Sequence, residues 1–202
     1  MVTERILKNM GQYYMPTLKD ETGKIETLYS HDFNNGLKLM EHSYIGNNFV
    51  SAVCDCISNE PKRVWWLGDY AETDDFYDKY SENSLSDAEM AIAWEDKSIR
   101  VRPDEVNQTW VYGNHFLINL DQKCYVKFND VNDDFQICPL PILTAVGSGR
   151  GGGDYFGTNM DLVGIWAGDR LLISDSLKES TKDYSDFQDC TEECFFSEQY
   201  QL

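Results

Sequence analysis

Half of the glycines in this chain lie in one short stretch, and this stretch constrains the fold more than any other part of the sequence. Seven of the fourteen glycines lie between Gly147 and Gly164, within a segment, residues 139–170, that also contains two apolar runs. Glycine has no side chain to pack, so such a cluster is typical of unusual backbone angles or of a backbone that closely approaches another group. The cluster predicts a tightly constrained loop between two strands.

Most of the predicted sheet comes from hairpins. The strand pairs are 12–18 with 24–30, 110–120 with 124–128, and 162–166 with 170–174. Each pair flanks a short turn, and Gly23 in the first turn tolerates a positive φ. A buried strand is predicted at 62–68 from its β-branched and aromatic residues. Another is predicted at 135–146, where Pro139 and Pro141 require an edge position or a bulge.

Two helices are predicted to pack on the sheet. The first covers about 49–57, has its apolar residues on one face, and is capped by one of the two asparagines that precede it. The second covers 86–96 and begins with the S-x-x-E sequence of a capping box. Met90 and Trp94 are its predicted buried face. The segment 37–45 is ambiguous between strand and helix.

These elements predict the α+β class, with an antiparallel sheet built from hairpins and about two packed helices. The 202 residues, 42% of them hydrophobic, suffice for one domain with a sizeable core. We assign residues 10–175 to that domain, with an acidic insert at about 69–96. Residues 1–9 are predicted to be an N-terminal extension, and residues 176–202, which lack sustained periodicity, an acidic and partly disordered tail.

The cellular location of the protein and the state of its cysteines are predicted from features that the sequence lacks. The first ten residues have no signal-peptide core, and no run approaches the ~20 apolar residues that span a bilayer. A cytoplasmic protein that does not contact membrane is therefore expected. The six cysteines do not have the spacing of zinc knuckles. We expect buried or incidental thiols, with no metal and no cofactor.

Acidic residues outnumber basic ones two to one, 35 against 17, so the formal net charge is −18. The excess is localised. Residues 69–96 contain ten acids and one lysine, and residues 175–202 contain eight acids and two lysines. Nucleic-acid binding requires clustered cations and is disfavoured. A charged partner should therefore be a basic protein.

The acidic insert is the leading candidate for a partner-binding surface. Aromatic side chains interleave with its carboxylates and are the expected contact anchors. The candidate residues are Asp69, Glu72, Asp74, Asp75, Asp78, Glu82, Phe76, Tyr77 and Tyr80. The alternative is a solvated acidic surface that only keeps the protein in solution.

The glycine-rich stretch is the second candidate site. Residues 147–152 match G-x-G-x-x-G, but the residues that follow cannot begin a good helix and place an acid where a phosphate would sit. Backbone N–H groups can still form an anion nest, to which Arg150 adds a bidentate contact. The candidate residues are Gly149, Arg150, Gly151, Gly152 and Asp154. The alternative is a structural loop in which Arg150 pairs with an acid such as Asp154.

Two histidine–acid pairs extend this second hypothesis. His31 with Asp32, and Glu41 with His42, can supply a general base or two metal ligands with carboxylates, because imidazole titrates near neutrality. Together with the glycine-rich stretch they suggest a nucleotide-binding protein or a metal-assisted phosphoester hydrolase. The alternative is that both histidines are satisfied surface or core residues.

Four segments resemble a group of small proteins from gut-type Firmicutes, their phages and mobile elements: MGQYYMP at residues 10–16, GLKLMEHSYIGNNFV at 36–50, VWWLGDY at 64–70 and PLPILTAVGSGRGGGDYFG at 139–157. The resemblance covers most of residues 10–173 and implies a genomic context, not catalytic residues. Small acidic proteins of such elements often inhibit host defence, including CRISPR effectors, by presenting carboxylates where the effector expects phosphates. The resulting hypothesis is an acidic inhibitor of a nucleic-acid-handling protein, and the enzyme is its alternative.

Overall fold

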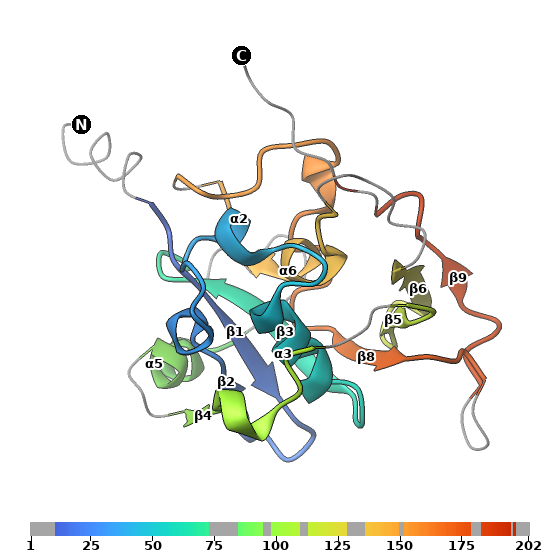
Figure 1. Cartoon of the computed structure of the whole chain (residues 1–202), viewed down its shortest axis with the longest axis horizontal. Helices are drawn as coiled ribbons and strands as arrows, with labels where there is room; N and C mark the ends of the chain where they lie inside the picture. Colours follow the sequence, from blue (N-terminus) through green and yellow to red (C-terminus); the bar gives the residue numbers. More distant parts are fainter. Residues whose placement is uncertain are drawn as a thin grey trace.

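The computed structural model describes residues 11–72, 85–94, 98–109, 113–128, 136–149, 152–178, 183–194 and 196. Within them, nine strands form one sheet in the order β4-β2-β1-β3-β8-β5-β6-β9, and β7 pairs with β3 (Figure 1). The strands are β1 (Tyr14–Lys19), β2 (Ile25–Thr27), β3 (Lys62–Gly68), β4 (Ile99–Arg100), β5 (Phe116–Asn119), β6 (Cys124–Lys127), β7 (Ala145–Val146), β8 (Arg170–Ser174) and β9 (Gln188–Asp189).

The α+β class and the mostly antiparallel sheet are confirmed. The predicted hairpins β1–β2 and β5–β6 both form, and their turns contain Gly23 with φ 86° and Lys123 with φ 55°. The buried strand β3 also forms where it was predicted. The sheet is nevertheless mixed, because β4, β7 and β9 each pair in parallel with a neighbouring strand.

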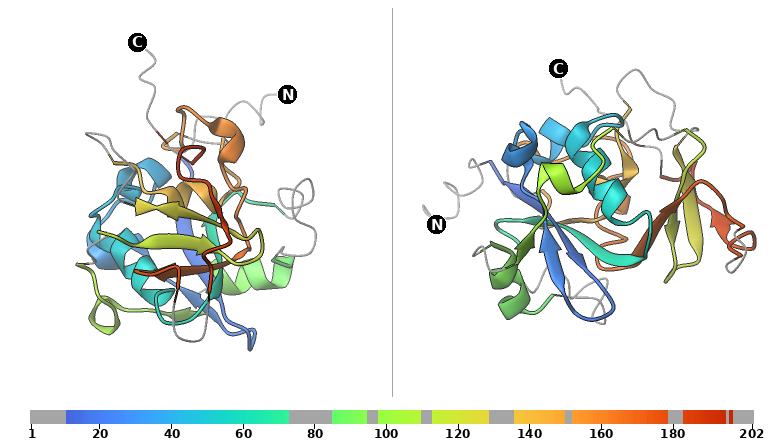
Figure 2. Two further views of the ribbon diagram at one scale, coloured as in Figure 1. Left: turned by 90° about the vertical axis from the view of Figure 1, so that its right-hand side faces the viewer. Right: turned by 60° about the horizontal axis from the view of Figure 1, so that its bottom comes forward.

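Two groups of strands meet at a narrow joint. The pairs Lys62–Leu171 and Arg63–Arg170 connect β3 to β8. They join the group β4-β2-β1-β3 to the group β8-β5-β6-β9. The two groups lie on either side of this joint in Figure 2.

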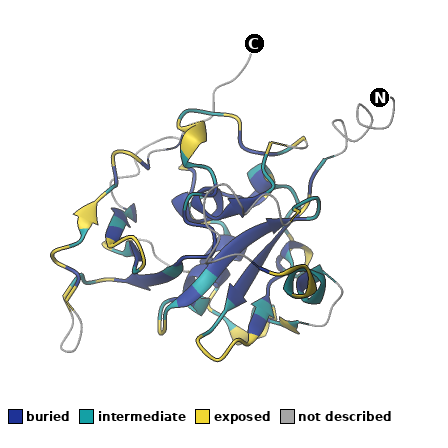
Figure 3. Cartoon of the chain, turned by 180° about the vertical axis from the view of Figure 1, so that it is seen from behind, coloured by how far each residue is buried: buried dark blue, intermediate teal, exposed yellow. Residues whose placement is uncertain are grey.

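Helices cover both faces of the first strand group. The described helices are α2 (Leu39–His42), α3 (Asn48–Cys56), α5 (Asp87–Trp94), α6 (Pro139–Leu143) and the short 3-10 helices η1 (Ser30–Phe33), η2 (Pro103–Glu105) and η4 (Met160–Leu162). Val64 and Trp66 of β3 face the main core with α3 and α6, whereas Trp65 and Leu67 face a second cluster with α5. This alternation follows from the two-residue period of a strand. Figure 3 shows the central strands buried along most of their length.

The two predicted helix starts are confirmed by their caps. The Asn47 side chain accepts hydrogen bonds from the backbone N–H groups of Phe49 and Val50 at the start of α3. At α5, Ser86 and Glu89 exchange the two bonds of a capping box, at 3.0 and 3.3 Å. Met90 and Trp94 are partly buried in the second cluster, as predicted. The ambiguous segment 37–45 contains the short helix α2.

The strand prediction at 135–146 was wrong over most of its described part. Residues Pro139–Leu143 form helix α6, whereas Ile137 makes an isolated β-bridge with Tyr44 and Ala145–Val146 form β7. Both prolines lie in the first turn of α6, where the backbone N–H groups have no intrahelical acceptor. Proline is therefore compatible with a helix here, although it disfavours a central strand.

The predicted strand at 162–166 was also wrong. This segment is the end of η4 followed by turns, and Gly164 has φ 75°. The backbone N–H groups of Gly164 and Trp166 donate to the carbonyl oxygens of Ile142 and Leu143, at 2.9 and 2.8 Å. The segment thus satisfies the C-terminal carbonyls of α6 instead of pairing with β8.

The described part of the predicted tail packs on the domain. β9 adds to the edge of the sheet beside β6, and the Cys194 and Phe196 side chains are buried in the main core. The Phe196 ring meets the Tyr155 ring edge-on, with 5.5 Å between their centroids. In the described residues, no helix combines the length and apolar character needed to cross a membrane.

Candidate functional site

The two candidate sites meet at one end of the sheet. β7 runs parallel to β3, so their C-terminal ends lie together. The glycine-rich loop leaves β7 at Gly147, and the acidic insert leaves β3 at Asp69. A Cβ atom at Gly147 would lie 3.1 Å from the Cα atom of Ala71. The loop and the start of the insert are therefore neighbours.

Asp154 organises the glycine-rich loop. The residue is 3% exposed, and its carboxylate accepts hydrogen bonds from the Tyr14 hydroxyl and the Gly149 backbone N–H, both at 2.7 Å. Burial and the Asp154 charge raise the pKa of Tyr14 far above its ordinary value, so the hydroxyl stays protonated and donates. These bonds favour the interpretation of Asp154 as a residue that holds the loop against β1.

Asp69 lies close enough to Asp154 for the two charges to interact. Its Oδ1 atom accepts a hydrogen bond from the Tyr13 backbone N–H at 3.0 Å. Burial raises the pKa of Asp69, and the Asp154 charge adds to that increase. Glu72 is exposed. The other predicted residues of the two sites lie outside the described residues: Asp74, Asp75, Phe76, Tyr77, Asp78, Tyr80, Glu82, Arg150 and Gly151.

Gln12 is a polar residue of this region that the sequence analysis missed. Its side chain is fully buried, and its amide nitrogen and oxygen have no hydrogen-bond partner within the described part of the chain. The amide fills the space in front of Gly68, where a Cβ atom would lie 1.7 Å from Nε2. Buried amides in proteins are usually paired with another polar group or with water. No local pattern marks this residue in the sequence.

Two adjacent glycines of the loop provide a test of its architectural role. Gly153 has φ 89°, and an added Cβ atom would lie 2.7 Å from the Cβ atom of Lys38. Gly153→Ala should therefore lower the free energy of unfolding by about 1–3 kcal/mol, through backbone strain and crowding. Gly152 has open space around its Cα atom, so Gly152→Ala should change stability by less than about 1 kcal/mol. Urea unfolding of both variants measures this difference, and equal losses would contradict it.

His42 is a buried structural residue. Its Nε2 atom accepts a hydrogen bond from the Trp66 indole N–H at 2.8 Å, so Nδ1 bears the hydrogen and donates to the Gly36 carbonyl at 3.0 Å. The side chain is fully buried, and burial lowers its pKa to about 4. Both ring nitrogens are engaged in the core. These contacts favour the alternative of a satisfied core histidine.

His31 and Asp32, the other predicted histidine–acid pair, contact different residues. Asp32 makes a bidentate ion pair with Arg100, at 2.7 and 2.8 Å, and a third contact with Arg102 at 3.2 Å. His31 is exposed and meets the Tyr29 ring edge-on. Glu41 accepts the Lys38 backbone N–H at the start of α2. These residues therefore stabilise local structure and do not assemble with His42 into one site.

The cysteines behave as core residues. All six are free thiols, and burial raises the pKa of Cys56 and Cys194 to about 12. A protonated thiol is a poor nucleophile and a poor metal ligand. In the described ranges, no three histidine, cysteine, aspartate or glutamate side chains are arranged to hold a metal ion.

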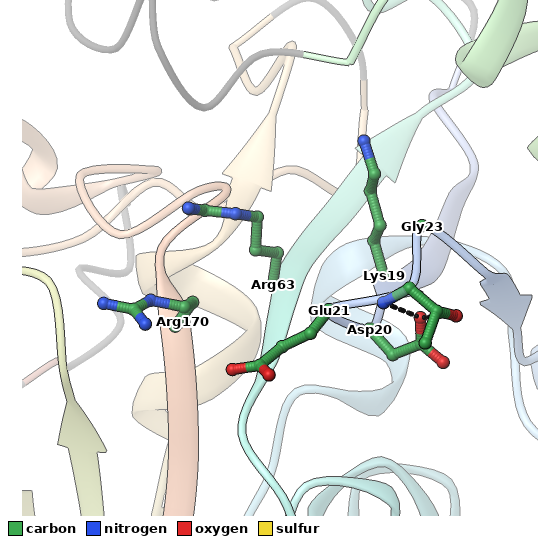
Figure 4. A pocket seen from close by; sticks show the side chains of 7 residues that line it. Lys19, Asp20, Glu21, Gly23, Arg63 and Arg170 are labelled. Atoms are coloured by element: carbon green, nitrogen blue, oxygen red, sulfur yellow. Dashed lines mark hydrogen bonds between the residues drawn. The ribbon is translucent and has the colours of Figure 1, made fainter.

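A pocket of about 460 Å³ lies beside the joint between β3 and β8 (Figure 4). The sequence analysis did not predict it, because its walls come from segments far apart in the chain. It is lined by Lys19, Asp20, Glu21, Thr22, Gly23, Arg63 and Arg170.

Comparison with protein-family models, curated proteins and solved structures finds no match to this chain.

Proposed function

We propose that this protein is an acidic binding protein that inhibits a nucleic-acid-handling partner by occupying its cationic surface. The observation that supports the proposal is the distribution of charge. Residues 69–96 have ten acids and one lysine, within a chain of net charge −18. Such a field attracts cationic surfaces over a distance and speeds association with them. The mobile-element context implied by the resemblance is consistent with a host nucleic-acid enzyme as the target.

The ion pairs of the described residues show which acids of the domain are neutralised internally. Nine lysines and arginines of the described residues each lie within 4.0 Å of a carboxylate: Lys19, Lys24, Lys62, Arg63, Arg100, Arg102, Lys127, Arg170 and Lys178. Among the described acids of the insert, Glu89 pairs with Lys19. The other eight of these basic residues contact described acids outside the insert.

The domain anchors the described residues of the insert on both sides of residues 73–84. Ala71 at one end and Leu85 at the other pack in the second apolar cluster, against Trp65 and Leu67 of β3. Helix α5 adds the Lys19–Glu89 ion pair at 2.6 Å. Anchored ends reduce the conformational entropy lost when the carboxylates between them engage a partner. The hydrolase alternative has less support, since His42 is buried with both ring nitrogens bonded.

Charge reversal in the insert tests the proposal. The triple variant Asp74→Lys, Asp75→Lys and Asp78→Lys should no longer capture a basic nucleic-acid-binding protein from host lysate at low salt. The unaltered protein should capture it at low salt and release it at high salt, because salt screens the attraction. Mass spectrometry of the bound fraction identifies the captured protein.

The control is an equal charge change elsewhere on the surface. Asp186, Glu192 and Glu193 are exposed residues near β9, and reversing all three to lysine alters the net charge by the same amount. This variant should keep its partner. If both triple variants lose the partner equally, the interaction depends on overall charge, and the insert is not the contact surface. If neither loses it, the proposal is wrong.

A further inference from the structure

The pocket at the joint places two arginines side by side in a strongly acidic protein. Arg63 of β3 and Arg170 of β8 are directly paired across the antiparallel strands. Their side chains are 32% and 41% exposed. In Figure 4 these two side chains and that of Glu21 extend toward the same side of the pocket. Like charges directly opposite one another repel, so a nearby anion stabilises this arrangement.

The Asp121 carboxylate contacts both guanidinium groups. Asp121 accepts from Nε of Arg170 at 2.7 Å, and its other oxygen lies 3.2 Å from Nη1 of Arg63. Nη2 of Arg170 also lies 2.7 Å from Asp121. The contacts with Asp121 therefore use two of the three nitrogens of Arg170. Nη1 of Arg63 also donates to the Gly168 carbonyl at 2.7 Å, and the Glu21 charge acts on Arg170.

The opposite wall is a preorganised turn. The Asp20 carboxylate accepts hydrogen bonds from the backbone N–H groups of Thr22 and Lys24, at 2.9 and 3.0 Å. Asp20 is thus engaged within the β1–β2 turn, while Glu21 at its tip is exposed. The lining of the pocket has three basic and two acidic side chains, in a chain with 17 basic and 35 acidic residues. The lining is therefore richer in basic side chains than the chain as a whole, with Lys19 paired to Glu89 and both arginines in contact with Asp121.

We propose that this pocket binds a small molecule through an oxyanion group, a carboxylate or a phosphate, held between the guanidinium groups of Arg63 and Arg170. The planar guanidinium fork matches the oxygens of both groups. The volume of about 460 Å³ lies within the usual range for small-molecule sites. Glu21 competes with the ligand for Arg170 and so lowers the affinity of the pocket for the ligand. This site shares no residue with the acidic insert, and its existence does not depend on the proposed inhibitor function.

Titration of the full chain with sodium phosphate and, separately, with succinate tests the site, with backbone amide NMR shifts as the readout. Binding of the unaltered protein should shift the amides of the β1–β2 turn and of β8. Arg170→Gln should weaken binding roughly tenfold, since it removes a charge-assisted hydrogen bond. Glu21→Gln should strengthen it several-fold, roughly, because it removes the competing charge. Whichever probe binds more tightly identifies the oxyanion class.

The matched control is Lys178→Gln. Lys178 pairs with Asp183 at 3.3 Å on the surface and does not line the pocket, and its substitution removes the same charge as Arg170→Gln. It should leave both affinities unchanged. If Arg170→Gln proves poorly folded, the Glu21→Gln result decides, because this exposed residue can be replaced without loss of a core contact. The proposal is overturned if neither probe shifts the pocket amides, if Glu21→Gln does not strengthen binding, or if Lys178→Gln weakens it as much as Arg170→Gln.

Discussion

His42→Ala is expected to lower the free energy of unfolding by about 3–5 kcal/mol. The substitution leaves the Trp66 indole N–H and the Gly36 carbonyl without their partner, at 2.8 and 3.0 Å in the protein. It also opens a cavity beside the Phe49 ring, whose centroid lies 5.0 Å from that of His42. Buried polar groups left unsatisfied and lost packing both act against the folded state. Urea unfolding at neutral pH measures the loss.

His31→Ala is the control for this experiment. His31 is exposed, and its described contact is an edge-on approach to Tyr29. Its removal should change stability by less than about 0.5 kcal/mol. The two histidines have the same side chain and were both predicted as site residues, so the comparison isolates burial. Similar losses for both variants would contradict the structural role assigned to His42.

The same histidine should make stability depend on pH. Its pKa is about 4 in the folded protein, against an ordinary value of 6.5. Between these values the unfolded chain binds a proton that the folded protein does not, so the free energy of unfolding falls as pH decreases. The full difference amounts to about 3 kcal/mol. His42→Gln should lack this contribution between pH 6.5 and 4, and an unchanged slope in unfolding titrations would argue against it.

Gly164→Ala is expected to destabilise the protein by about 2–5 kcal/mol. Gly164 has φ 75°, and an added Cβ atom would lie 2.3 Å from the carbonyl oxygen of Ala145. That oxygen belongs to β7, which is held between β3 and the core and cannot move away as a flexible side chain would. The substitution should therefore also weaken the bond from the Gly164 N–H to the Ile142 carbonyl. Thermal and urea unfolding both report the loss.

Gly46→Ala measures the cost of backbone strain without a steric clash. Gly46 has φ 85°, and nothing lies within 4 Å of the position of an added Cβ atom. It should cost about 1–2 kcal/mol, from the left-handed backbone alone. The difference between the two variants measures the contact with Ala145. Equal costs would mean that β7 yields to the added methyl group.

The predictions that depended on neighbours in the chain were largely confirmed. The turn before Gly23 forms because the Asp20 side chain binds backbone N–H groups two and four residues later. The Ser86–Glu89 box and the Asn47 cap are equally local. The β-branched and aromatic residues were sufficient to predict β3, and the helical apolar pattern was sufficient for α3, which buries one side in the main core. All these interactions lie within a few residues of sequence.

The incorrect predictions concern segments whose partners are distant. The proline-containing run at 139–143 has the composition of a strand, yet it forms a helix whose last carbonyls accept N–H groups from Gly164 and Trp166. The same bonds prevent 162–166 from pairing as a strand. Composition cannot distinguish these outcomes, because a short apolar run can be buried as either a strand or a helix.

Charge, fold class and several local elements were thus determined by the sequence itself, because side-chain chemistry and short-range spacing are sufficient for them. Only the tertiary structure decided which polar groups meet. It brings Asp154 to Tyr14, 140 residues away, places His42 between Trp66 and Gly36, and pairs Arg63 with Arg170 at the edge of a pocket. The physical reason is that each contact depends on sheet order and strand register. These are set by the sum of many long-range packing and hydrogen-bonding interactions that no single stretch of sequence contains.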